Sequence, residues 1–254
     1  MNKITLITGA TSGIGKSCAI IFAKYNHDLI LIGRREDRLA NISKELKKTY
    51  GINVLILSFD IRDKDAVAEA IESIPSKWRN ISILINNAGL AVGLSTIQEG
   101  EIDDWERMID TNVKGLLYMS RAVLPLLVKQ NSGHVINIGS IAGKEVYPNG
   151  NVYCATKHAV DALSKAMRID LVNHGIKVTQ IAPGAIETEF SIVRFKGDQE
   201  KADSIYTGYQ PLLPDDVAAV VYYTTTLPPH VNINDLVLMP TAQASATVFN
   251  KNNK

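Results

Sequence analysis

Short runs of Ile, Leu and Val alternate along this chain with longer stretches of helical pattern. The runs lie at 3–8, 28–32, 53–58, 81–86, 133–138, 175–181 and 235–239. They are nearly continuous in branched apolar residues, which is typical of strands buried on both faces of a parallel sheet. The helical stretches lie at roughly 13–26, 36–49, 63–74, 103–130, 151–174 and 214–226. The alternation predicts an α/β fold, a doubly wound parallel sheet of about seven strands with helices on both faces.

The length of 254 residues allows one large domain or two small ones. The unbroken alternation favours one domain over residues 1–249, followed by the polar tail "NKNNK" at 250–254. A net charge of +1 gives no reason to expect nucleic acid or an anionic membrane as a partner. The apolar runs are far shorter than the ~20 residues of a membrane span, and the N-terminus lacks a signal-peptide pattern.

The chain has two cysteines, Cys18 and Cys154, both inside helical patterns. Two cysteines are too few for a disulfide scaffold, and their small number suits a reducing cytoplasm. We expect both Cys18 and Cys154 to be small core residues. The sequence has no CxxC, HxxxH or carboxylate cluster, so we expect no metal.

A glycine-rich stretch, "TGATSGIG" at 8–15, follows the first predicted strand. Gly9 ends that strand, and Gly13 and Gly15 open the next helix. Glycine allows a diphosphate to approach the main chain, and the helix N-terminus favours an anion. The spacing differs from G-x-G-x-x-G, so the stretch indicates nucleotide binding through its position between a strand and a helix.

The end of the second predicted strand selects between the two nicotinamide dinucleotides. NAD-binding folds typically place Asp or Glu there to hold the ribose 2′-hydroxyl. This chain has Arg34 and Arg35 instead, and guanidiniums suit a 2′-phosphate. A solvated basic pair is the alternative, although the helix dipole disfavours cations at that position. We therefore predict NADP as the cofactor.

Tyr153 and Lys157 lie one turn apart on one face of a predicted helix. Alone, the pair is compatible with a core tyrosine and a lysine that extends past it to solvent. Four elements together change that interpretation: "TGATSGIG", "NNAG" at 86–89, Ser140, and Tyr153-x-x-x-Lys157. In this order and at these spacings the chain resembles the short-chain dehydrogenase/reductases over essentially its whole length, which implies a Rossmann fold.

A narrower resemblance rests on "GRREDRL", "INNAGLAVG", "DWERMIDTNVKGLLYMSRAVLP", "GHVINIGS", "GNVYCATK", "VRFKGD" and "LPPHVNIN". These stretches are similar to the NADP-dependent 3-hydroxy acid dehydrogenases, the group of that family that oxidises serine and allo-threonine. The resemblance implies oxidation of small 3-hydroxy acids and reduction of the matching semialdehydes or keto acids. Two alternatives stay open, an NADPH-dependent carbonyl reductase of broader specificity and a non-catalytic NADP-sensing protein.

The resemblance also implies catalytic roles. Tyr153 is the general acid/base, and Lys157 lowers the pKa of its phenol and holds the nicotinamide ribose. Ser140 orients the substrate oxygen. Asn112 matches an asparagine that kinks a helix and holds a water molecule, with a backbone-satisfied asparagine as the alternative.

Further cofactor contacts follow from the same resemblance. Asp60 matches an acid that binds the adenine, although a helix-capping role, which suits Asp63 better, is the alternative. Together with Arg34, Arg35, Tyr153 and Lys157, the predicted cofactor residues are Gly9, Thr11, Ser12, Gly13, Ile14, Gly15, Asp60, Ile61, Asn87, Ala88, Gly89, Pro183, Gly184, Ile186 and Thr188.

Residues 189–213 form the longest region without a clear strand period, and we expect them to cover the substrate as a lid. Arg194 is the predicted partner of a substrate carboxylate, with a surface or subunit-contact arginine as the alternative. Val146 and Tyr147 are expected either to line the pocket or simply to pack. The stretches 103–130 and 151–174 are more apolar than one sheet face requires, which predicts burial against another subunit. Family resemblance implies a homotetramer.

Overall fold

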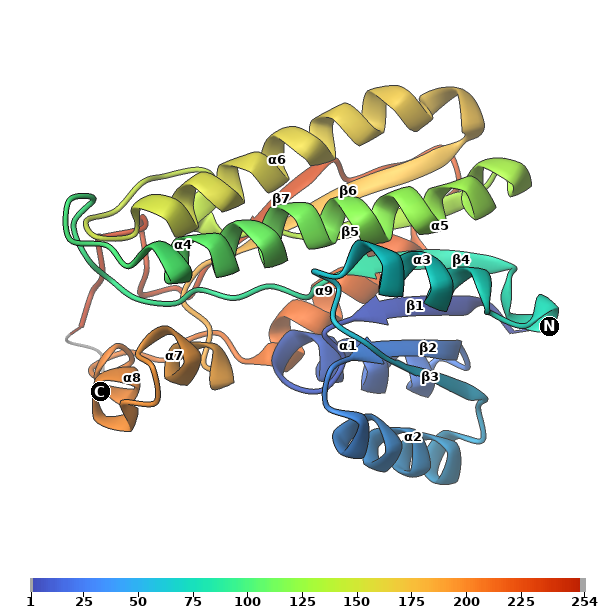
Figure 1. The fold of residues 1–254 in the computed structure, drawn as a ribbon, viewed down its shortest axis with the longest axis horizontal. Coiled ribbons are helices and arrows are strands. Elements are labelled where there is room, and N and C mark those ends of the chain that lie inside the picture. The colour runs from blue at the N-terminus through green and yellow to red at the C-terminus, as the bar shows by residue number, and fades with distance from the viewer. Residues whose placement is uncertain (1, 252–254) are drawn as a thin grey trace.

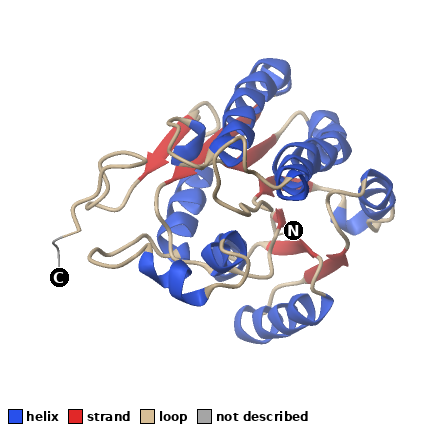
Figure 2. Ribbon diagram, turned by 60° about the vertical axis from the view of Figure 1, so that its left-hand side comes forward, coloured by secondary structure: helices blue, strands red, loops and turns tan. Residues whose placement is uncertain are grey.

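The computed structural model describes residues 2–251, and their strands form one parallel sheet (Figure 1 and Figure 2). The sheet order is β3-β2-β1-β4-β5-β6-β7. Each predicted run forms one strand, within two residues of its expected bounds. The strands are β1 Ile4–Thr8, β2 Asp28–Gly33, β3 Val54–Ser58, β4 Ile81–Asn86, β5 Gly133–Ile138, β6 Ile176–Pro183 and β7 Asp235–Leu238. The doubly wound α/β prediction is confirmed.

The helices also follow the predicted pattern, except that the stretch 103–130 is divided and that two short helices lie within the predicted lid at 189–213. They are α1 Gly13–Lys24, α2 Glu36–Tyr50, α3 Lys64–Glu72, α4 Ile102–Ile109, α5 Leu116–Gln130, α6 Asn151–Leu171, α7 Glu189–Arg194, α8 Gln199–Ser204 and α9 Pro214–Thr226. The stretch 103–130, expected as one helix, is divided by a π-helical turn, η2 (Asp110–Gly115). Short 3₁₀ turns lie at η1 Ser76–Trp78, η3 Ile141–Gly143 and η4 Val172–His174.

Two apolar cores lie on opposite faces of the sheet, because successive strand residues point to opposite sides. In β1, Ile7 packs into the core made with α1, α2 and α9, whereas Leu6 packs into the core made with α3, α5 and α6. Cys18 belongs to the first core, and Cys154 is buried in a third, smaller cluster beside Tyr153. Both cysteines are therefore small core residues, as predicted.

The strand order reverses between β1 and β4 at the centre of the sheet. The connection after β1 leads to one side of the sheet and the connection after β4 to the other, which opens a crevice at the strands' carboxyl ends. The glycine-rich turn and the turn at 86–89 both lie at this position. The topology therefore brings together motifs that are far apart in the sequence.

No helix within residues 2–251 is both long and apolar enough to cross a membrane. Across the same residues, no group of three or more His, Cys, Asp or Glu side chains could hold a metal ion. Of the predicted polar tail, Asn250 and Lys251 are described, and the backbone N–H of Asn250 donates to the Ala242 carbonyl at 2.8 Å. Residues 252–254 lie outside the described residues.

The buried histidines His27 and His134 make the fold sensitive to acid. Burial, with a smaller effect of nearby lysines, lowers the pKa of each imidazole to about 4. The unfolded chain therefore binds more protons than the folded chain between pH 6.5 and pH 4, and stability falls as the pH falls through that window. We expect a loss of about 1–3 kcal/mol, measured by urea denaturation. The variant His27→Gln/His134→Gln should show a flatter pH dependence; an unchanged slope would contradict the assignment.

Candidate active site

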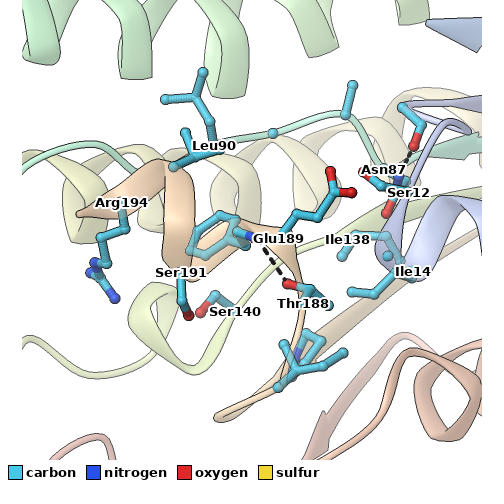
Figure 3. Close-up of a pocket in the computed structure, with 18 of the residues that line it drawn as sticks. Ser12, Ile14, Asn87, Leu90, Ile138, Ser140, Thr188, Glu189, Ser191 and Arg194 are labelled. Carbon is cyan, nitrogen blue, oxygen red and sulfur yellow. Dashed lines mark hydrogen bonds between the residues drawn. The ribbon is translucent and has the colours of Figure 1, made fainter. Parts of the chain in front are cut away.

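A cavity of about 630 Å³ lies at the carboxyl ends of the strands (Figure 3). A volume of this size suits a nucleotide or other small ligand. Most of the predicted site residues line the cavity: Gly9, Thr11, Ser12, Gly13, Ile14, Arg34, Arg35, Asp60, Ile61, Asn87, Ala88, Gly89, Ser140, Tyr147, Tyr153, Lys157, Pro183, Gly184, Ile186, Thr188 and Arg194. Three predicted residues, Gly15, Asn112 and Val146, do not line it.

The glycine-rich turn forms a shallow cradle before α1. Gly9 and Gly13 adopt φ angles of +67° and +51°, a backbone conformation that favours glycine. Gly15 supports the turn from behind, because a Cβ there would lie 2.3 Å from the Gly9 carbonyl oxygen. The bare backbone and the N-terminus of α1 fit a bound diphosphate.

The two predicted arginines behave differently. The Arg35 guanidinium donates to Thr11 Oγ1 from Nε at 3.1 Å and from Nη2 at 2.8 Å, and Nη2 also donates to Ser12 Oγ at 2.9 Å. The Arg34 side chain is 61% exposed and lies 3.6 Å from the Asp60 carboxylate. Hydrogen bonds to the glycine-rich turn therefore fix the Arg35 guanidinium, whereas the Arg34 guanidinium is largely exposed and can turn from Asp60 toward a ligand.

Asp60 itself lies on the cavity and accepts from the Arg62 side chain, from Nε at 3.0 Å and from Nη2 at 2.7 Å. Burial raises the pKa of Asp60, but the hydrogen bonds and charge of Arg62 and the charge of Arg34 outweigh it and hold the pKa below its usual range. The capping role belongs to Asp63, which accepts from the backbone N–H groups of Asp65 and Ala66. Asp60 is thus an ionised acid at the cavity rather than a helix cap.

Tyr153 and Lys157 project from α6, and both side chains are buried. The Lys157 ammonium lies 5.9 Å from the centroid of the Tyr153 ring and donates to the Ile138 carbonyl oxygen at 2.9 Å. Ser140 follows β5, and its Oγ accepts from the Ala142 N–H at 3.1 Å. The helix and the adjacent strand end therefore bring the hydroxyl, the phenol and the ammonium to one wall of the cavity.

The pKa values at this wall differ from the expectation. Burial raises the pKa of Tyr153 well above its usual range, and Tyr147 raises it further, against smaller opposing effects of Ser140 and Arg194. Burial also lowers the pKa of Lys157 to about 8. Lys157, 5.9 Å from the ring centroid, is not among the groups that lower the phenol pKa, so the expected lowering by Lys157 is not seen in this structure, where burial sets the direction for both groups.

Asn112 lies in η2, a π-helical turn at the position where the resemblance implies a helix kink. Its Oδ1 accepts from the Leu90 N–H at 2.8 Å, and its Nδ2 donates to the Leu90 carbonyl at 2.8 Å and to Thr156 Oγ1 at 3.0 Å. The protein itself thus satisfies the Asn112 amide, as the alternative interpretation stated. A role in holding a water molecule stays a prediction. The turn after β4 runs so close that a Cβ on Gly89 would lie 3.2 Å from Asn112 Oδ1.

Arg194 ends α7 and lies over two aromatic rings. Its guanidinium carbon is 5.2 Å from the centroid of the Tyr153 ring and 5.3 Å from that of Tyr147, and Nη2 donates to the Tyr147 hydroxyl. Its buried Nε–H has no hydrogen-bond partner within residues 2–251. Among those residues no carboxylate lies within ion-pair distance of Arg194.

Tyr147 and Val146, which follow η3, differ in their outcome. Tyr147 lines the cavity as predicted. Val146 is 69% exposed, because the loop after η3 turns its neighbour Tyr147 inward, so the pocket-lining expectation for Val146 is wrong.

Several lining residues escaped sequence reasoning. Phe190 packs edge-on against Tyr153 with ring centroids 5.7 Å apart. Gln243 and Phe249 reach the cavity from the segment after β7, and the Gln243 Oε1 accepts from the Ala185 N–H at 2.7 Å. The sequence carries no local pattern for these contacts, because they join segments far apart in the chain. Arg38, in the first turn of α2, does not line the cavity, but its place four residues after Arg34 could have been noticed in the sequence.

Comparison with known proteins places this geometry in a family. The family model described as short chain dehydrogenase matches residues 3–199. The chain is 48% identical to the NADP-dependent 3-hydroxy acid dehydrogenase of Escherichia coli strain K12, over 96% of this chain and 97% of that protein. It is 45% identical to sulfoacetaldehyde reductase 2 of Chromohalobacter salexigens, over 96% of each chain.

A solved structure described as the closed form of serine dehydrogenase complexed with NADP+ has the same fold. It superposes with a TM-score of 0.91 at 48% identity, over 96% of this chain and 98% of that one. The chain belongs to the short-chain dehydrogenase family. It is therefore an oxidoreductase that acts on CH–OH groups.

The buried Lys157 ammonium lowers the stability of the fold. Lys157→Met should raise the free energy of unfolding at pH 7 by about 1–2 kcal/mol, because it replaces a buried cation with an apolar chain of similar length. The gain should shrink from about pH 8 to pH 10.5, since the folded protein then already holds a neutral lysine and the wild type gains stability with pH. Urea denaturation across this range measures both effects. Lys165→Met, at an exposed position on the same helix, is the control and should give no such gain.

Proposed function

We propose that this protein catalyses the NADP-dependent oxidation of the hydroxyl group of small 3-hydroxy acids such as L-serine, L-allo-threonine or 3-hydroxypropionate, and the reduction of the matching semialdehydes and keto acids. Two relatives support the proposal, the dehydrogenase from Escherichia coli and the serine dehydrogenase of known structure, each 48% identical to this chain. The observation that carries the substrate class is the buried, unpaired Nε–H of Arg194 beside Tyr153.

The residues around the cavity fit NADP in position and chemistry. The glycine-rich cradle would hold the diphosphate, Asp60 and Ile61 the adenine, and Arg34 and Arg35 the 2′-phosphate. The turn at 87–89 would face the adenine ribose, Lys157 the nicotinamide ribose, Ile186 the carboxamide, and Thr188 a phosphate. When bound, NADP supplies the acceptor or donor of the hydride.

The chain's own residues handle the proton and orient the substrate. Ser140 would hold the substrate oxygen, and Tyr153 would take the hydroxyl proton in oxidation or return it in reduction. The raised pKa of Tyr153 favours the protonated phenol, which is the acid that reduction requires. Lys157 would place its positive charge next to the phenol and stabilise the phenolate that oxidation requires.

Arg194 would bind the substrate carboxylate. A guanidinium makes charge-assisted hydrogen bonds with carboxylates, and a buried N–H without a partner gains most from such a bond. Because Arg194 lies over the Tyr153 ring, a carboxylate on Arg194 would place the hydroxyl-bearing carbon of a small acid near the phenol. The lid at 189–213, which carries Arg194, would close the substrate pocket.

A second candidate is reduction of a small carbonyl compound with another acidic group. The similarity to a sulfoacetaldehyde reductase favours it, because a sulfonate can accept from the same guanidinium.

We also propose that the protein is a homotetramer. Leu117 on α5, Ile169 on α6 and Val172 in the turn after α6 expose apolar side chains that a partner subunit would cover. We place the protein in the cytoplasm.

Absorbance of reduced nicotinamide tests the reaction directly. Purified protein should reduce NADP+ in the presence of L-serine or L-allo-threonine, and should reduce NAD+ more weakly. Tyr153→Phe should lower kcat by about 10²–10⁴-fold, because it removes the proton acceptor and leaves the ring in place. Absence of turnover with hydroxy acids, together with NADPH oxidation by sulfoacetaldehyde or simple ketones, would overturn the substrate class and retain the chemistry.

Arg194→Met should lower kcat/KM for 3-hydroxy acids by about 10–100-fold, mainly through KM, because it removes the cationic partner of the carboxylate. Arg194→Lys keeps the charge but loses the planar fork, and should have an intermediate effect. Initial rates with each acid and its methyl ester provide the measurement. Wild-type protein that turns over the esters as well as the acids would rule out a carboxylate clamp.

A further inference from the structure

An ion-pair cluster connects the lid to Arg35, one of the two arginines proposed for the 2′-phosphate, and to its neighbour Arg38 on α2. Glu189, the first residue of α7, accepts from Arg35 Nη1 at 3.0 Å. It also accepts from Arg38 Nη1, at 2.8 Å on Oε1 and 3.1 Å on Oε2. Glu189 is 154 residues from Arg35 and 151 from Arg38 along the chain, so this contact ties two distant segments together.

The carboxylate binds the part of Arg35 that does not contact the glycine-rich turn. Nε and Nη2 of Arg35 are bonded to Thr11 and Ser12, whereas Nη1 points to Glu189. Carboxylates and phosphates form the same kind of charge-assisted bond with a guanidinium. Glu189 and a phosphate would therefore require the same donor.

Glu189 is held in its ionised form. Burial raises the pKa of its carboxyl group, but the hydrogen bonds and charges of Arg38 and Arg35 outweigh that effect and hold the pKa below the usual range. Figure 3 shows Glu189 between Arg194 and Ser12, with its carboxylate pointing away from Arg194 toward the side where Ser12 lies. At neutral pH a bound 2′-phosphate would thus meet a negative charge from the lid.

We propose that Glu189 competes with the 2′-phosphate of NADP for Arg35 and Arg38. Binding of the phosphate releases the N-terminus of α7, whereas NAD, which lacks this phosphate, leaves the contact intact. Glu189 therefore lowers the affinity for the 2′-phosphate and makes the lid respond to the identity of the dinucleotide. This inference rests on the proposed NADP specificity.

The short helix α7 carries this effect to the substrate side. Glu189 is its first residue and Arg194 its last. The far end is held separately, because the Gly93 N–H donates to the Arg194 carbonyl at 3.0 Å and Lys196 Nζ lies 2.7 Å from Asp104 Oδ2.

After release at Glu189, the middle of α7 stays held by the hydrogen bond between Ser191 Oγ and the Tyr206 hydroxyl (2.5 Å) and by Phe190 against the Tyr153 ring. The freed first turn can therefore shift while the helix stays on the cavity, and this one short helix joins the phosphate site to the proposed carboxylate clamp.

Titration calorimetry with cofactor fragments tests the competition without turnover. The ligands are adenosine 2′,5′-bisphosphate, which has the 2′-phosphate, and adenosine 5′-monophosphate, which lacks it. Glu189→Gln should bind the bisphosphate about 3- to 10-fold more tightly than wild type and bind the monophosphate equally. Glu200→Gln, which removes a carboxylate from α8 of the same lid, is the matched control and should change neither affinity. Unchanged or weaker bisphosphate binding by Glu189→Gln would overturn the proposal.

Limited trypsin digestion tests the coupling to the lid. Lys196 and Lys201 have side chains 54% and 69% exposed, so they report the opening of the lid. The bisphosphate should speed cleavage at these lysines in wild type, and should have a much smaller effect in Glu189→Gln, where the negative charge that competes with the phosphate is already absent. Equal protection of both proteins by the bisphosphate would overturn the coupling.

The wild-type titrations separate this inference from the proposed function. If wild type binds the bisphosphate no more tightly than the monophosphate, the NADP specificity fails and the competition fails with it. If wild type prefers the bisphosphate and Glu189→Gln gains nothing, the competition alone is wrong. Preference in wild type with a further gain in Glu189→Gln supports both.

Discussion

The turns that follow β1 and β4 touch each other, and the rest of the site depends on that contact. Thr8 Oγ1 accepts from the backbone N–H groups of Asn87 and Ala88, each at 3.0 Å, and the Asn87 amide donates to the Thr8 and Gly9 carbonyls. A Cβ on Gly9 would lie 2.9 Å from the Ala88 Cα. These bonds hold the crevice at the reversal of strand order, with the cradle on one side and the catalytic wall on the other.

The catalytic wall, formed by Ser140, Tyr153 and Lys157, holds positively charged side chains in places that water hardly reaches. Lys157 is buried against the Ile138 carbonyl, and Arg194 lies over two tyrosine rings. Neither cation has a carboxylate partner within the described residues, so the full burial of Lys157 and the partial burial of Arg194 oppose folding. The two apolar cores on either side of the sheet supply the stability that tolerates these groups. The lid adds a further constraint, since α7 connects a cation at the substrate end to a carboxylate at the cofactor end.

Most of the fold was predictable because its signals are local. Continuous runs of Ile, Leu and Val identified every strand, and the glycine-rich stretch at 8–15 fell where a strand ends and a helix begins. The irregular turn in the predicted helix 103–130 was indicated only by the resemblance, through Asn112. Its hydrogen bonds, from Asn112 Nδ2 to the Leu90 carbonyl and to Thr156 Oγ1, were not predictable because no local pattern shows them. The pKa of Tyr153 was expected in the wrong direction, since spacing shows which charge is near but not how far burial removes both groups from water.

The sequence by itself determined the order of strands and helices along the chain and the residue types placed at the strand ends. Apolar periodicity, glycine at a strand end, and a tyrosine one turn from a lysine act over a few residues and can be recognised in one dimension. Only the tertiary structure decided which charges meet. Glu189 with Arg35 and Arg38, and the unpaired Nε–H of Arg194, depend on segments brought together by the sheet and the lid. Electrostatic energy depends on separation in space and on burial, and neither is written in the spacing of residues along a chain.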